Sequence, residues 1–172
     1  MTNWKTWVGI GVLMFLFGLL ALGNAVVTSL AITVMLGSLF AIAGVAQLWA
    51  GFSGVLQVNR GFTLLWGLIS LLIGVSFIAN PLEGTVSLTM LVTGFLLASG
   101  LIRLLMAWRM RESRLFWALL FSGAVTVLLG GYILANFAAI SLSLLGILFG
   151  IELLVDGAGL IGFGLFLRNH RL

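Results

Sequence analysis

Cysteine is absent from this 172-residue chain, which also has only four acidic residues, one histidine and one proline. Without cysteine there is no disulfide, thiolate nucleophile or thiolate metal ligand. The single histidine, His170 beside Arg171, excludes a histidine-rich metal site and a Ser-His-Asp triad. Phosphate-loop, dinucleotide-binding and zinc-protease motifs are missing too. We therefore expect no enzyme activity, no metal and no cofactor.

Charge is scarce as well, because 7% of the residues are charged while 62% are hydrophobic and the mean hydropathy is +1.30. Water-soluble domains do not have this composition. A helix that crosses about 30 Å of hydrocarbon needs roughly 20 apolar residues, and six such runs are present. The sequence predicts an all-α polytopic membrane protein. Its six helices are expected over 5–23, 25–50, 62–79, 81–108, 115–135 and 137–166.

The formal net charge of +4 does not indicate nucleic-acid binding, because the basic residues form no stripe. They lie instead at chain and helix ends that a six-span protein places on one face, and the opposite turns have no lysine or arginine. The positive-inside rule then predicts that both termini are cytoplasmic. All six tryptophans lie near the same face, as membrane-interface residues do. The basic residues at these ends are Lys5, Arg60, Arg109, Arg111, Arg114, Arg168 and Arg171, and the tryptophans are Trp4, Trp7, Trp49, Trp66, Trp108 and Trp117.

An internal period of 56 residues runs through the chain and divides it into three two-helix repeats, at about 4–58, 60–113 and 115–169. Each repeat starts on the same face, so the three run in parallel within a single membrane domain, 1–172. The first coinciding set is Gly11, Gly67 and Gly123, the second is Gly18, Gly74 and Gly130, and the third is Asn24, Asn80 and Asn136.

The three asparagines stand at the tight turn inside each repeat, where a side-chain oxygen can accept from the amides that open the next helix. We therefore predict that Asn24, Asn80 and Asn136 are helix caps. In the second repeat Pro81 follows the cap and Glu83 stands three residues after it, which is a variant of the capping box. Glu83 is thus expected to be a cap residue.

Glycine is abundant, with 23 residues, and small residues let membrane helices approach closely. Gly146 and Gly150 have the four-residue spacing of helix-packing motifs, as do Gly94 and Ala98. We expect these glycines to pack helices within the bundle, and dimerisation is the alternative. The expected surroundings are the lipid bilayer and either a second copy or another membrane protein.

Two carboxylates, Glu152 and Asp156, lie one helical turn apart inside the last apolar run, where an unpaired charge is costly. The 56-residue period aligns Gln47 with Arg103 and Gly159. It also aligns Asp156 with glycines at 44 and 100, so that Asp156 is expected to replace a repeat glycine. We predict a buried network of Arg103, Glu152, Asp156 and Gln47, in which one carboxylate pairs with Arg103.

Three stretches resemble the HdeD family of bacterial acid-resistance membrane proteins. They are Gly94-Phe-Leu-Leu-Ala-Ser-Gly-Leu-Ile-Arg-Leu104, Trp108-Arg-Met-Arg111 and Gly150-Ile-Glu-Leu153. The resemblance covers nearly the whole chain. It implies a six-helix protein of the bacterial cytoplasmic membrane that is linked to survival under acid and other stress, with no established mechanism. Arg103 and Glu152 fall in the shared stretches, whereas Asp156 does not.

These observations favour a non-enzymatic membrane protein of acid and stress tolerance. The first alternative is a small transporter or channel that moves protons or a solute past Arg103, Glu152 and Asp156. A further alternative is a membrane subunit or regulator of a larger complex, which would dock through glycine-rich helix faces.

Overall fold

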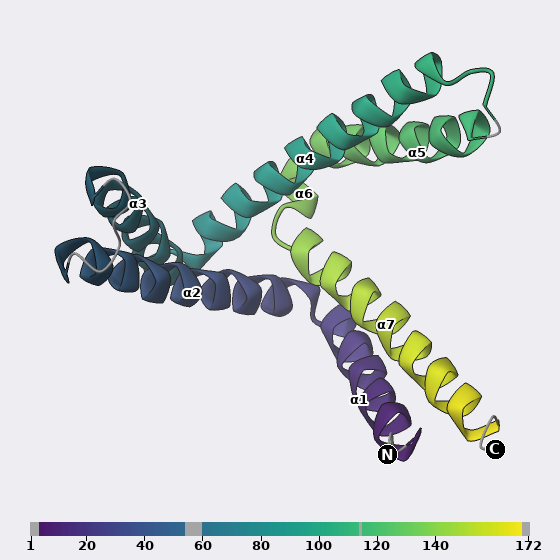
Figure 1. The fold of residues 1–172 in the computed structure, drawn as a ribbon, viewed down its shortest axis with the longest axis horizontal. Helices are drawn as coiled ribbons and strands as arrows, with labels where there is room; N and C mark the ends of the chain where they lie inside the picture. The colour runs from purple at the N-terminus through teal and green to yellow at the C-terminus, as the bar shows by residue number, and fades with distance from the viewer. Residues whose placement is uncertain (1–3, 54–59, 114, 170–172) are drawn as a thin grey trace. The chain divides into compact units, whose positions relative to one another are not determined.

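The computed structural model describes residues 4–53, 60–113 and 115–169, and these are helical apart from short turns (Figure 1). The predictions made for Arg114, His170 and Arg171 concern residues outside these ranges. The helices of the described part are α1 (Trp4–Gly23), α2 (Ala25–Ser53), α3 (Arg60–Ala79), α4 (Pro81–Arg109), α5 (Phe116–Ala135), α6 (Phe137–Ile140) and α7 (Leu144–Asn169).

Six of these helices, all but the four-residue α6, are long and apolar enough to cross a membrane. The predicted six-span, all-α membrane fold is confirmed. Large apolar side chains lie on the outside of the helices, such as Trp49 at 76% exposure and Phe121 at 74%. The fully buried side chains of the described residues include Ser29, Thr33 and Thr89. This arrangement suits a bilayer, where lipid tails solvate large apolar side chains and helices pack through small ones.

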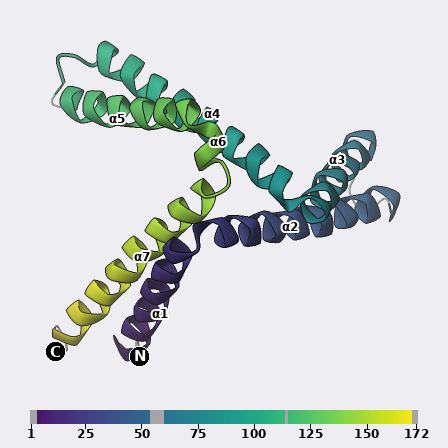
Figure 2. The same cartoon turned by 180° about the vertical axis from the view of Figure 1, so that it is seen from behind.

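The described chain forms two compact units, one of α1, α2, α3 and α7 and the other of α4 from Leu82 onward with α5 and α6. In the first unit α1 lies beside α7 and α2 lies beside α3. In the second unit α4 lies beside α5, as both opposite views show (Figures 1 and 2). All three pairs are antiparallel.

The packing pairs differ from the sequence repeats, because each repeat contributes its two helices to different pairs. The second helix of one repeat packs against the first helix of the next, as α2 does with α3, and the last helix, α7, packs against the first, α1. The 56-residue period therefore describes the order of the helices and not their contacts. The single helix predicted over 137–166 also differs from the structure, in which turns at 141–143 separate α6 from α7.

Candidate functional site

Glycines seven residues apart hold each antiparallel pair together. Seven residues are about two helical turns, so such glycines line up along one side of a helix. We describe each contact by the distance from a Cβ atom built on one glycine to the carbonyl oxygen of the glycine that faces it. All three distances are shorter than an ordinary van der Waals contact. They are 2.8 Å for Gly44 and Gly67, 2.8 Å for Gly157 and Gly11, and 3.2 Å for Gly100 and Gly123.

The glycines predicted to pack helices lie at such contacts, with the exception of Gly94. A Cβ on Gly18 would lie 2.9 Å from the carbonyl oxygen of Gly150, and Gly146 meets the backbone of Ala25. A Cβ on Gly94, by contrast, would have nothing within 4 Å, so Gly94 is not at a contact of the described residues. The remaining predicted glycines at close contacts are Gly11, Gly67, Gly74, Gly123 and Gly130.

The contacts correct the alignment of the third repeat. Gly157 approaches α1 as Gly44 approaches α3, so Gly157 is the equivalent of Gly44 and of Gly100. The prediction that Asp156 replaces a repeat glycine is therefore wrong, because the third repeat carries one additional residue before Gly150. That residue lies between Asn136, which still follows the 56-residue period, and Gly150. The heptad spacing of Gly150, Gly157 and Gly164 was the sequence signal that could have revealed this shift.

Gln47 and Arg103 occupy equivalent places in their own pairs. The Cβ atom of Gln47 lies 3.1 Å from a Cβ built on Gly67 of the adjacent helix. The Cβ atom of Arg103 lies at the same distance, 3.1 Å, from a Cβ built on Gly123. Gln47 is half-buried and Arg103 is exposed. With the corrected alignment, the third member of this set is Leu160 and not Gly159. The stem of Arg103 thus packs beside a helix contact, although the residue as a whole is exposed.

Glu152 and Asp156 are both exposed on α7. Gly157 faces α1, and at about 100° per residue Asp156 points about 100° and Glu152 about 140° away from that direction. Both carboxylates therefore lie on the side of α7 that α1 leaves uncovered. Arg103 belongs to one compact unit and the two carboxylates to the other, so the predicted ion pair stays a prediction.

Buried hydroxyl groups support the break between α6 and α7. The backbone amide of Gly146, in the first turn of α7, donates to Oγ of Ser29 at 2.8 Å. Helix-opening amides have no acceptor within their own helix, so Ser29 satisfies one of them from α2. On the other side of the break, Oγ1 of Thr89 donates to the carbonyl oxygen of Ser141 at 2.7 Å. Sequence reasoning missed both hydroxyl groups, whose signal is a polar residue on the buried side of an apolar helix.

The turn asparagines differ from the predicted caps at one position. Asn136 makes no side-chain cap hydrogen bond to α6, and its Nδ2 instead donates to the carbonyl oxygen of Tyr132 at 3.0 Å. Asn136 therefore closes α5 rather than opening the next helix, and its predicted role is corrected. The capping roles of Asn24, Asn80 and Glu83 stay predictions.

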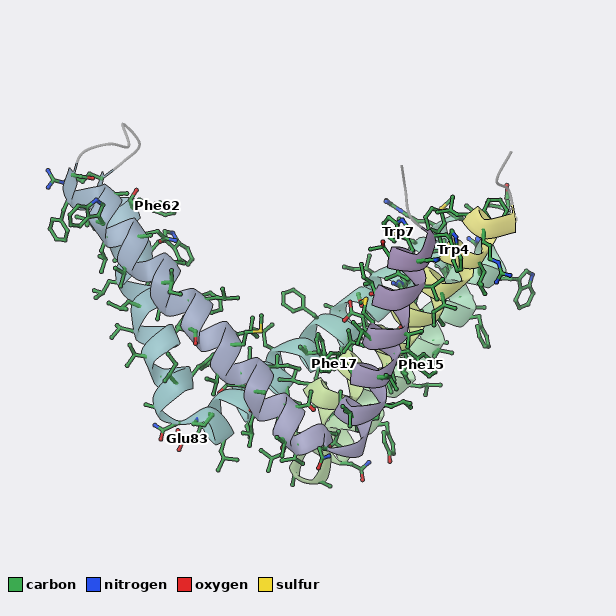
Figure 3. The ribbon with its side chains drawn as sticks, turned by 90° about the horizontal axis from the view of Figure 1, so that it is seen from below. Trp4, Trp7, Phe15, Phe17, Phe62 and Glu83 are labelled. Carbon is green, nitrogen blue, oxygen red and sulfur yellow. The ribbon has the colours of Figure 1, made fainter. Side chains whose placement is uncertain are left out.

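Aromatic and basic side chains meet at the ends of the helices. The guanidinium of Arg168 lies 5.4 Å from the ring centroid of Trp4, and that of Arg111 lies 5.3 Å from the ring of Trp108. The rings of Trp7 and Phe163 make an edge contact at 5.6 Å. Figure 3 shows Trp4 and Trp7 near the start of α1. Such clusters are typical of the boundary between hydrocarbon and water.

Nothing in the described residues forms a metal centre, since no group of three His, Asp or Glu residues could hold an ion there. The polar side chains of the spans are instead spread along separate helices. Together, the fold and these residues define a polytopic α-helical membrane protein built from glycine-packed pairs of helices.

Comparison with known proteins names the family. The family described as a short repeat of unknown function (DUF308) matches residues 9–79 and again 65–135, and the chain belongs to this family. The two matches are offset by 56 residues at both ends, from 9 to 65 and from 79 to 135, which agrees with the internal period. Each match covers three helices, which are one complete packing pair and the helix before it. The family is not an established enzyme family.

The relatives of this chain include proteins named HdeD. Protein HdeD of Escherichia coli (strain K12) is 29% identical over 170 residues, which cover 94% of this chain and 86% of the relative. Protein HdeD of Shigella flexneri matches to the same extent. No solved structure matches the chain. The predicted membership of the HdeD family is confirmed.

Proposed function

We propose that this protein is a non-enzymatic component of acid and stress tolerance in the bacterial cytoplasmic membrane, with both termini in the cytoplasm. The observation that carries the proposal is the similarity to HdeD proteins over 94% of the chain. The orientation is supported by Lys5, Arg60, Arg109 and Arg168, which stand at the helix ends that the positive-inside rule assigns to the cytoplasm. The lack of cysteine, the single histidine and the small number of acidic residues support a role without catalysis.

Deletion of the gene tests this proposal directly. We expect the deletion strain to survive exposure to low pH less well than its parent, and a plasmid copy to restore survival. Colony counts after acid exposure, in exponential and in stationary phase, measure the effect. Unchanged survival in both phases would contradict the proposed link to acid tolerance. A C-terminal reporter that is active only outside the cytoplasm tests the orientation and should give no signal.

A second candidate function is the movement of protons or a small solute. It is favoured by the break between α6 and α7, because interrupted membrane helices often mark ion and substrate sites in transporters. Helix α7 also carries Glu152 and Asp156, on the side that α1 leaves uncovered. Arg103, on α4, is the third charged residue of this candidate.

Reconstitution in liposomes distinguishes the two candidates. If the protein moves protons, an imposed pH gradient should collapse faster in vesicles with the protein than in empty vesicles, and Glu152→Gln should abolish the difference. A pH-sensitive dye inside the vesicles measures the rate. Ser87→Ala, at an exposed position of α4, is a control that should leave the flux unchanged. Equal rates with and without protein under every gradient would remove the transporter candidate.

A further inference from the structure

The end of α4 combines an apolar groove with a basic pocket. The groove has a volume of about 450 Å³ and is lined by Ile102, Leu105, Met106, Trp108 and Arg109. A second hollow, of about 470 Å³, adjoins it where α4 ends and is lined by Arg109, Met110, Arg111, Glu112 and Ser113. Arg109 lines both hollows.

The two hollows match the two halves of a phospholipid. In the apolar groove, Leu105 is 68% and Ile102 56% exposed, and both lie on the last turns of a membrane-spanning helix. An acyl chain can cover these apolar side chains of the groove. In the basic pocket, two guanidinium groups can each donate to phosphate oxygens, which arginine binds with favourable geometry.

The basic pocket is also partly preorganised. The Arg111 guanidinium lies 5.3 Å from the Trp108 ring, a cation–π distance that limits the freedom of the side chain. Oγ of Ser113 accepts a hydrogen bond from the backbone amide of Leu115 at 3.2 Å, which fixes the turn after α4. Glu112 is the one acidic residue that lines the pocket, so two positive charges and one negative charge leave a net charge of +1.

We propose that this surface, Ile102 to Ser113, binds an anionic phospholipid of the bilayer. Its phosphate would be held by Arg109 and Arg111, and one acyl chain would lie along the groove at Leu105 and Met106. The preference for an anionic headgroup follows from the net positive charge of the pocket. This assignment is independent of the proposed role in acid tolerance.

Native mass spectrometry of the full-length protein in detergent, titrated with phosphatidylglycerol or phosphatidylcholine, tests the assignment. We expect tighter binding of phosphatidylglycerol, and a loss of affinity of about fivefold for each of Arg109→Gln and Arg111→Gln. Glu112→Gln removes the opposing charge and should raise the affinity by a similar factor. Since that variant changes binding in the opposite direction, misfolding cannot imitate its effect.

Two controls separate this site from general attraction to charge. Arg60→Gln removes one positive charge at the start of α3, lines neither hollow and should leave the affinity unchanged. Soluble glycerol phosphate should not displace the lipid, because it lacks the chain that occupies the groove. Equal binding of both lipids, an equal loss with Arg60→Gln, or displacement by glycerol phosphate would overturn the proposal.

Discussion

Gly157→Ala is expected to destabilise the protein by about 1–3 kcal/mol, the usual cost of overpacking a close contact. The added Cβ would lie 2.7 Å from the backbone nitrogen of Phe15 and 2.8 Å from the carbonyl oxygen of Gly11. Both are backbone atoms of α1, so relief requires that the two helices separate. The free energy of unfolding, measured by denaturant titration in mixed micelles with circular dichroism, would report the loss.

Gly162→Ala is the matched control on the same helix. A Cβ at Gly162 has nothing within 4 Å, and alanine is favoured over glycine in a helix by about 1 kcal/mol. The equivalent positions in the other repeats, Trp49 and Leu105, carry large exposed side chains. This variant should be neutral or slightly stabilised. If both variants lost the same stability, close packing at Gly157 would not be the cause.

The reciprocal variant tests the contact from the other side. A Cβ on Gly11 would lie 2.8 Å from the carbonyl oxygen of Gly157, so Gly11→Ala should also destabilise α1 against α7. Once one substitution has separated the helices, the second costs less, and the double variant should lose less than the sum of the two single losses. Strictly additive losses would indicate that the two glycines do not share one contact.

The six spans could be predicted from the lengths of the apolar runs, because a helix that crosses a bilayer needs about 20 apolar residues. The pairing of the helices could not. The 56-residue period says that α1, α3 and α5 are alike, but it leaves open whether α2 packs on α1 or on α3. The seven-residue spacing of Gly37, Gly44 and Gly51 identifies the contact side of α2. It does not identify the partner helix, because several other helices carry glycines at the same spacing.

The candidate site was harder to predict, since a single residue changes the alignment of the third repeat. Gly157, not Asp156, follows the repeat glycines, and the shift falls between Asn136 and Gly150, the stretch that contains the turns at 141–143. A fixed period cannot show an insertion inside an apolar run. The buried hydroxyl of Ser29 was missed for a related reason, because its acceptor role depends on the amide of Gly146, 117 residues away in the chain.

The corrected alignment sharpens the predicted ion pair. Asp156 now corresponds to Ser99 of α4 and Glu152 to Phe95, whereas Arg103 lies four residues beyond Ser99. On α7 the equivalent of Arg103 is Leu160, which lies four residues, a distance of about 6 Å, from Asp156 and eight residues, about 12 Å, from Glu152. An arginine side chain spans the first distance more readily, so we propose Asp156 as the partner of Arg103.

A double-mutant cycle on Arg103 and each carboxylate tests this pairing. Arg103→Gln and Asp156→Asn should each destabilise the protein by about 2–4 kcal/mol, because each leaves one charge unpaired within a membrane-spanning helix. The double variant should lose little more than either single variant, since no charge is then left alone. Unfolding free energies in mixed micelles supply all four corners of the cycle.

Glu152→Gln is the comparison on the same helix. If Asp156 is the partner of Arg103, the losses of stability caused by Glu152→Gln and by Arg103→Gln should be additive. The exchange Arg103→Asp with Asp156→Arg restores opposite charges and should recover part of the lost stability. A coupling near zero for Asp156 together with a strong coupling for Glu152 would reverse the assignment. If neither carboxylate is coupled to Arg103, Arg103 forms no ion pair with α7. Glu152 and Asp156 would then be two unpaired acidic residues in one membrane helix, which strengthens the argument for a proton pathway.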